Sequence, residues 1–163
     1  MVTRVCFDSN AWIALLNDES DKDLGSLREW LTIAARRDAR LIVPAIVAAE
    51  VAVNPDLAAV STFESLMQRP EIDVVDITTT VASFAGKLRR QTLNANKTNK
   101  SIKTVRMIDA LVIASSHLSG ADYLLSHDIG VQKLNGMFGI APQIGPFDTG
   151  LPKMPLFDDN LND

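Results

Sequence analysis

The sequence predicts an α/β fold, a three-layer α/β/α sandwich with a central, mainly parallel sheet. Short apolar or β-branched runs recur along the chain, and amphipathic segments of helical period separate them. With 163 residues and a hydrophobic fraction of 47%, the chain is large enough for one core. Strands separated by helices of about 10 to 15 residues are typical of parallel sheets that helices cover on both faces.

The first half of the chain is predicted to hold three strands. Residues 2–7 alternate and then become apolar, so we expect a strand that ends at Asp8, with a helix directly after it. Pro44 suits the first turn of the helix that follows the second strand. The predicted elements, in order, are strand 2–7, helix 9–17, helix 21–38, strand 41–43, helix 45–53, helix 56–69 and strand 72–77.

The second half of the chain continues the alternation of predicted strands and helices. Residues 94–101 are polar and carry no apolar period, so we expect a mobile loop there. Residues 1–145 form the predicted domain, and residues 146–163 a Pro-rich acidic tail without regular structure. The predicted elements are helix 78–93, a helix around Asp109 that ends near Gly120, strand 123–126, helix 129–134 and a candidate edge strand within 138–144.

Composition excludes several classes of protein. No run of about 18 apolar residues is present, as a membrane span would need, and the N-terminus lacks the order of a signal peptide. We therefore expect a cytoplasmic protein without membrane contact. The single cysteine, Cys6, rules out an intrachain disulfide and a cysteine-rich zinc site, and its apolar strand predicts a buried side chain. No G-x-G-x-x-G or P-loop pattern indicates nucleotide binding.

Positive charge is concentrated in one segment. The net charge of −4 alone argues against a nucleic-acid partner. Residues 87–106, however, contain seven of the 16 basic residues and no acid, which leaves nine basic residues against all 20 acidic ones elsewhere. Such a run is often only a solvated helix face, but this one leads directly to Asp109. The candidate nucleic-acid contacts within it are Arg89, Arg90, Lys97, Lys100, Lys103 and Arg106.

Two carboxylates are predicted to lie at one rim of the sheet. Asp8 ends the first strand and Asp128 follows strand 123–126. In open parallel sheets the ligand site lies beyond the carboxyl ends of the strands. Glu50, on helix 45–53, has no cation one helical turn away, so it either joins this rim or lies on the surface.

Asp109 is a single charge within the apolar run MIDALVIASS. Burying an unpaired carboxylate costs several kcal/mol, roughly the stability of a small domain, so a partner is expected. Three interpretations remain open: a carboxylate of the site, a cap of a helix that starts at Ala110, and a local pair with Arg106.

A divalent cation would account for all four acids together. Carboxylates that share a site repel one another unless a cation lies between them. Mg²⁺ or Mn²⁺ prefers oxygen ligands and is typically held by a few carboxylates while substrate phosphates complete its shell. Such a site activates water for in-line attack on a phosphodiester. The four acids and the adjacent cationic segment therefore predict metal-dependent hydrolysis of a nucleic-acid backbone.

The ordered acidic motifs resemble those of PIN-domain nucleases. FDSNAWI resembles the family's opening, and AAEV, DALVIAS and YLLSHD resemble its remaining acidic positions, in order, up to about Leu134. The resemblance implies a Mg²⁺- or Mn²⁺-dependent endoribonuclease on a small α/β/α sandwich. It assigns catalysis and metal binding to Asp8, Glu50, Asp109 and Asp128, and a supporting role to Ser9, Asn10 and Ser126.

A single small PIN domain of this length is similar to the toxin of VapBC-type toxin-antitoxin pairs. That resemblance implies an RNA substrate, a homodimer, and an antitoxin partner whose peptide enters the acidic groove. The alternatives are a non-toxin RNA-processing PIN nuclease and a catalytically silent RNA- or protein-binding module of the same fold.

Other chemistries fit the residues less well. An aspartyl-phosphate phosphatase would need a second Asp where this chain has Asn10. His117 and His127 share no metal-ligand spacing, and a metal-bound water needs no histidine base, so we expect structural or solvent roles for both. Trp12 and Trp30 occupy apolar helical positions and are predicted to pack in the core.

Overall fold

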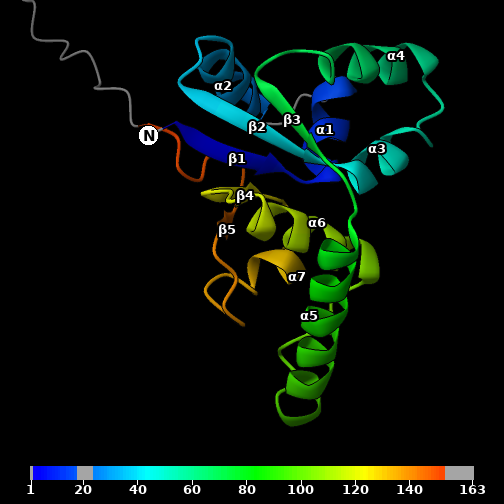
Figure 1. The fold of residues 1–163 in the computed structure, drawn as a ribbon, viewed down its shortest axis with the longest axis vertical. Coiled ribbons are helices and arrows are strands. Elements are labelled where there is room, and N and C mark those ends of the chain that lie inside the picture. The colour runs from blue at the N-terminus through cyan, green and yellow to red at the C-terminus, as the bar shows by residue number, and fades with distance from the viewer. Residues whose placement is uncertain (1, 18–23, 153–163) are drawn as a thin grey trace, which may run out of the picture.

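A sheet of five parallel strands forms the centre of the computed structural model, which describes residues 2–17 and 24–152 (Figure 1). The strand order is β3-β2-β1-β4-β5, and every neighbouring pair is parallel. The strands are β1 (Thr3–Phe7), β2 (Ala39–Pro44), β3 (Ile72–Val75), β4 (Tyr123–Leu125) and β5 (Gln143–Gly145). The prediction of a mainly parallel sheet is confirmed, and the candidate edge strand is present as β5.

Helices cover both faces of this sheet, so the predicted three-layer sandwich is also confirmed. Figure 1 shows α1 to α4 on one side and α5 to α7 on the other. The helices are α1 (Ser9–Leu16), α2 (Leu24–Ala35), α3 (Ala45–Val51), α4 (Leu57–Leu66), α5 (Thr79–Thr98), α6 (Met107–Leu118) and α7 (Ile129–Gln132). Within the described residues, no helix has both the length and the apolar character needed to span a membrane.

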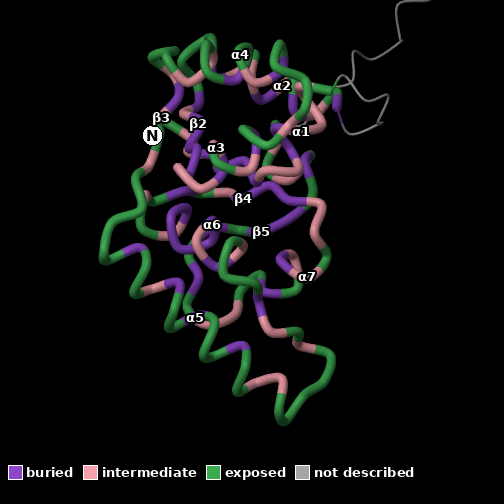
Figure 2. Tube along the Cα trace, turned by 90° about the vertical axis from the view of Figure 1, so that its right-hand side faces the viewer, coloured by how far each residue is buried: buried purple, intermediate pink, exposed green. Residues whose placement is uncertain are grey.

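The core lies between the sheet and these helices (Figure 2). Trp12 and Trp30 are almost fully buried, as predicted. The ring of Trp12 packs against Phe7 and Phe63, with centroid distances of 5.3 and 5.4 Å. Cys6 is also buried, as predicted, and its burial raises the pKa of the thiol well above its usual range.

The prediction of a mobile loop over residues 94–101 is wrong in its first half, because α5 continues to Thr98. Instead of an apolar stripe, the last turns of α5 carry polar side chains that form hydrogen bonds to the segment after the helix. Asn96 Nδ2 donates to the Ile102 carbonyl at 2.6 Å. A hydrogen bond of this kind leaves no apolar period in the sequence, so the pattern alone predicts a loop.

Other boundaries differ by a few residues. Pro44 ends β2 and flanks α3, rather than standing in the first turn of the helix. Residues 21–23 of the predicted helix 21–38 lie outside the described residues, as do residues 153–163 of the predicted tail. Phe147, just beyond β5, is buried in the core.

The strand order reverses direction at β1. From β1 the chain moves outward to β2 and β3, and it then returns to β4 on the other side of β1. Ligands of open α/β sheets bind where the strand order reverses in this way, beyond the carboxyl ends of the strands. We therefore expect a ligand site at the rim formed by the carboxyl ends of β1 and β4.

Candidate active site

Asp8 and Ser126 lie side by side at this rim. The register pairs Phe7 with Leu125, so the next residue of each strand falls beside the other. Ser126 Oγ donates to Asp8 Oδ2 at 2.6 Å, and Asn10 Nδ2 donates to the same oxygen at 3.2 Å. Asp8 Oδ1 accepts from the backbone N–H and the hydroxyl of Ser9 at 2.7 and 3.3 Å. The carboxylate of Asp8 is thus held in one orientation.

The environment of Asp8 raises the pKa of its carboxyl group. Burial raises the pKa of Asp8 above its ordinary value, and the negative charges of Asp109 and Glu50 raise it further. The hydrogen bonds from Ser126 and from the Ser9 backbone act in the opposite direction and favour the ionised form. Glu50 on α3 and Asp109 on α6 therefore lie close enough to act electrostatically on Asp8, which directly follows β1.

Glu50 is partly buried on α3, and one of its oxygens is unusual. Glu50 Oε2 is buried and accepts no hydrogen bond from any residue in the described part of the chain. An unpaired buried carboxylate oxygen is costly unless another group satisfies it. This atom therefore indicates a missing cation or hydrogen-bond donor, and a simple surface position for Glu50 is wrong.

Asp109 lies in the first turn of α6, where the helix dipole favours a negative charge. The helix begins at Met107 and its flanking residue, Arg106, makes no side-chain cap, so the interpretation of Asp109 as a cap before Ala110 is wrong. The local pair is present instead. Arg106 Nε and Nη2 donate to Asp109 Oδ2 and Oδ1 at 2.8 and 2.9 Å, which is a two-bond fork.

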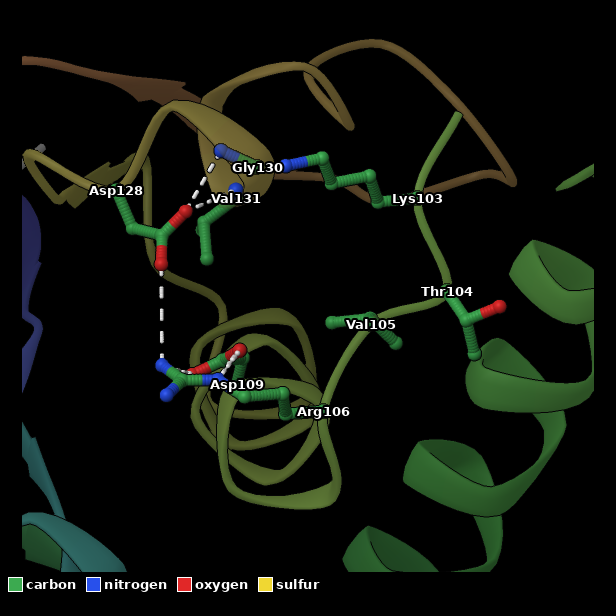
Figure 3. A pocket seen from close by; sticks show the side chains of 8 residues that line it. All are labelled: Lys103, Thr104, Val105, Arg106, Asp109, Asp128, Gly130 and Val131. Carbon is green, nitrogen blue, oxygen red and sulfur yellow. Dashed lines mark hydrogen bonds and ion pairs between the residues drawn. The ribbon is translucent and has the colours of Figure 1, made fainter. Parts of the chain in front are cut away.

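Asp128 stands opposite this pair (Figure 3). Its Oδ1 caps α7 by accepting from the backbone of Gly130 and Val131 at 2.6 and 3.2 Å. Its Oδ2 lies 3.8 Å from Arg106 Nη2. A cavity of about 200 Å³ separates the two sides. It is lined by Lys103, Thr104, Val105, Arg106, Asp109, Asp128, Gly130 and Val131.

The predicted RNA-contacting cations fall into two groups. Arg106 and Lys103 line the cavity beside Asp109 and Asp128. The others are exposed along α5 and the segment after it, outside that lining: Arg89, Arg90, Lys97 and Lys100. The buried face of α5 carries Val81, Ala85, Leu88 and Thr92 and packs with α6.

Both histidines have structural contacts. His117 Nδ1 accepts the Ala141 N–H at 3.0 Å, and its ring stacks on Phe84 at a centroid distance of 4.6 Å. The ring of His127 stacks on Phe147. These contacts agree with the structural roles expected from the sequence.

Sequence reasoning missed Thr92. This side chain is fully buried on α5, and its hydroxyl accepts the Val105 N–H at 3.2 Å while donating to the Arg89 carbonyl at 2.9 Å. It therefore fixes the backbone next to Arg106. A signal was available, because Thr92 continues the spacing of Val81, Ala85 and Leu88 as a polar residue within an apolar stripe.

The donor set at the rim suits a hard divalent cation in its chemistry. Carboxylate oxygens are the preferred ligands of Mg²⁺ and Mn²⁺, and Glu50 Oε2 lacks a donor. In residues 2–17 and 24–152, however, no three His, Cys, Asp or Glu side chains are already gathered around one point. Arg106 holds Asp109 instead. The chemistry of these side chains therefore fits a divalent ion, while their arrangement in this structure does not enclose one.

Solved structures share the fold across almost all of this chain. A chain of the Rickettsia felis VapBC2 complex bound to promoter DNA is 14% identical with a TM-score of 0.65, over 88% of this chain and 98% of that one. A chain of DNA-bound VapBC from Salmonella typhimurium is 14% identical with a TM-score of 0.63, over 90% and 99%.

A third similar structure is Mycobacterium tuberculosis VapC20, described as a toxin that cleaves the sarcin-ricin loop. It is 15% identical with a TM-score of 0.55, over 85% of this chain and 99% of that one. A search of curated proteins finds no significant match. The sequence model of the PIN domain matches residues 5–136, which includes Asp8, Glu50, Asp109 and Asp128. This chain therefore belongs to the PIN domain family.

Proposed function

We propose that this protein is an endoribonuclease that hydrolyses RNA phosphodiester bonds with Mg²⁺ or Mn²⁺ bound by Asp8, Glu50, Asp109 and Asp128. The observation that carries the proposal is that Glu50, on α3, and Asp109, on α6, act electrostatically on the buried Asp8. Burial raises the pKa of Asp8, and these two negative charges raise it further. The buried, unsatisfied Glu50 Oε2 supports it. Membership of the PIN domain family supports the nuclease class.

In this proposal the chain's own residues set the geometry. A bound divalent ion would supply a water of lowered pKa and polarise the phosphoryl oxygen. Ser126, Asn10 and Ser9 fix the orientation of the Asp8 carboxylate through their hydrogen bonds. Asp128 is fixed by its cap on α7. Preorganised carboxylates of this kind lose little entropy when ion and substrate arrive.

The basic residues would position the RNA backbone. Lys103 and Arg106 line the cavity beside Asp109 and Asp128. Four further cations are exposed on α5 and on the segment directly after it: Arg89, Arg90, Lys97 and Lys100. Contacts of this type hold phosphates without reading the base sequence.

We further propose that the protein is the toxin of a VapBC-type pair, acting in the cytoplasm as a homodimer and held inactive by an antitoxin. The similarity of its fold to chains of two VapBC complexes and to VapC20 supports this role. Expression should then arrest growth, and the neighbouring antitoxin gene should relieve the arrest. Growth that continues while the protein accumulates would favour the alternative of an RNA-processing nuclease.

The nuclease proposal is tested by RNA cleavage with and without Mg²⁺ or Mn²⁺, using the native chain, Asp8→Asn and Asp109→Asn. We expect each substitution to lower cleavage by at least about 100-fold, because a metal ligand matters at least as much as its supporting residues. Cleavage that survives a chelator, or survives both substitutions, would overturn the metal-dependent mechanism. Absence of cleavage by the native chain with either metal would favour the catalytically silent binding module.

A further inference from the structure

The guanidinium of Arg106 joins two carboxylates of the acidic site. It makes the two-bond fork to Asp109 and lies 3.8 Å from Asp128 Oδ2 (Figure 3). It is thus a cation between two acids that approach the cavity from different elements. Without a metal, a positive charge at this place reduces the repulsion between the carboxylates.

The two partners of the main ion pair are unequally buried. The Asp109 side chain is 12% exposed and the Arg106 side chain is 75% exposed. A mostly solvated guanidinium gains little free energy from one ion pair, because water screens the attraction and the long side chain loses freedom. Arg106 can therefore leave Asp109 at small cost when another cation takes its place, because the nearly buried Asp109 would otherwise be left without a partner.

The backbone beneath Arg106 is fixed. The preceding N–H, that of Val105, is bonded to the buried Thr92, and the Ile102 carbonyl is bonded to Asn96. The Arg106 carbonyl accepts the Ala110 N–H at 2.9 Å as the first bond of α6. Movement of Arg106 is thus confined to its side chain, which can turn outward without opening the loop.

We propose that Arg106 is an internal competitor of the divalent ion, so that guanidinium and ion occupy the space between Asp109 and Asp128 in turn. The inference rests on the proposed metal-binding function of the acidic site. Binding of the ion requires Arg106 to turn outward, where its planar fork of donors suits an RNA phosphate. Arg106 thus pairs with the carboxylates when no metal is bound, and it contacts the RNA substrate when the metal is bound.

The test is Mn²⁺ binding by isothermal titration calorimetry to the full chain. The variants are Arg106→Ala, which removes the competitor, and Arg106→Lys, which keeps the charge and loses the two-bond fork. With competition, the apparent affinity for Mn²⁺ is the intrinsic affinity multiplied by the fraction of molecules in which Arg106 has turned outward. Arg106→Ala should therefore bind Mn²⁺ about three- to tenfold more tightly than the native chain. Arg106→Lys should lie between this variant and the native chain.

Lys103→Ala is the matched control, since Lys103 lines the same cavity but makes no ion pair among the described contacts. It removes one positive charge at a similar place, and its affinity should change by less than about twofold, as expected for a solvated charge without a bonded partner. Thermal melts of every variant without metal report whether the fold is retained, and Arg106→Lys serves if Arg106→Ala does not fold.

Two results overturn the inference alone: unchanged or weaker Mn²⁺ binding by both Arg106 variants, and equal tightening by Lys103→Ala, which would indicate only a general charge effect. Absence of Mn²⁺ binding by the native chain and every folded variant would overturn the proposed metal site together with the inference. The outcomes are therefore distinguishable.

Discussion

Ser126 Oγ lies 2.6 Å from Asp8 Oδ2 although 118 positions separate the two residues. The parallel register of β1 and β4 brings them together, since Phe7 pairs with Leu125 one position earlier. Ser126 Oγ also accepts the Asp128 N–H at 3.1 Å. One buried hydroxyl thus connects two of the four acids of the site.

Removing that hydroxyl should disorder both acids. In Ser126→Ala, Asp8 Oδ2 loses its shortest hydrogen bond and the Asp128 N–H loses its acceptor. We expect RNA cleavage to fall about 10- to 100-fold, as for other residues that orient metal ligands, with a loss of about 1–3 kcal/mol in unfolding free energy. Cleavage assays and urea unfolding measure the two effects.

Ser9→Ala is the matched control for that prediction. The Ser9 hydroxyl is 3.3 Å from Asp8 Oδ1, and the shorter backbone bond at 2.7 Å remains after the substitution. Its effect on cleavage should therefore be much smaller. Equal losses in the two variants would contradict a special role for the bond between β1 and β4.

The pH dependence of stability should show that the native state disfavours the ionised form of Asp8. Its raised pKa means that the native state keeps the proton when the unfolded chain, with a pKa of about 3.9, has already lost it. The stability from protonated Asp8 is thus complete below about pH 3.9 and is lost as the pH rises through the native pKa. Asn at this position does not titrate.

The native chain should therefore lose stability relative to Asp8→Asn as the pH rises from about 4 to 7 in a chelator, with the unfolded pKa as the lower limit. Urea unfolding at several pH values measures this difference. Addition of Mn²⁺ at pH 7 should stabilise the native chain more than the variant. A difference that grows in favour of the native chain at higher pH would contradict the raised pKa.

Some of this site could be predicted from the sequence because short segments determine it. A strand that ends in Asp8 and turns directly into α1 places that acid at the rim, and the parallel-sheet rule places Asp128 at the same rim. The alternation of strands and helices was enough for the fold class. These are local patterns, with one general rule of topology added.

The remaining features depend on contacts between distant segments. The sequence allowed a pair between Arg106 and Asp109, but Asp128 is the second acid near Arg106 only because β4 returns beside β1. The last turns of α5 are similar, since Asn96 bonds to the returning chain at Ile102. Hydrophobic periodicity contains no information about either contact.

The buried hydroxyl of Thr92 should contribute measurably to stability. Thr92→Val keeps the shape and removes the acceptor of the buried Val105 N–H, which should cost about 1–3 kcal/mol in unfolding free energy. Hydrogen exchange of the Val105 amide should also become faster.

Thr98→Val is the control, because the Thr98 hydroxyl donates to the Ala95 carbonyl on the exposed surface, and its cost in unfolding free energy should be within about 0.5 kcal/mol. Continued protection of the Val105 amide in Thr92→Val would show that another group accepts its hydrogen.

The salt dependence of RNA binding should reveal whether α5 contacts phosphates. Arg90 is exposed on α5, whereas Arg36 is exposed just after α2. Figure 1 shows α2 and α5 at opposite ends of the molecule. For single-stranded RNA, each phosphate contact that is lost should reduce the slope of log K against log salt by about 0.7. Fluorescence anisotropy in a chelator, which prevents metal-dependent cleavage, should therefore give a shallower slope for Arg90→Ala and an unchanged slope for Arg36→Ala. If both variants kept the native slope, Arg90 would belong to a solvated helix face, and any RNA contact by the basic segment would be made by its other cations.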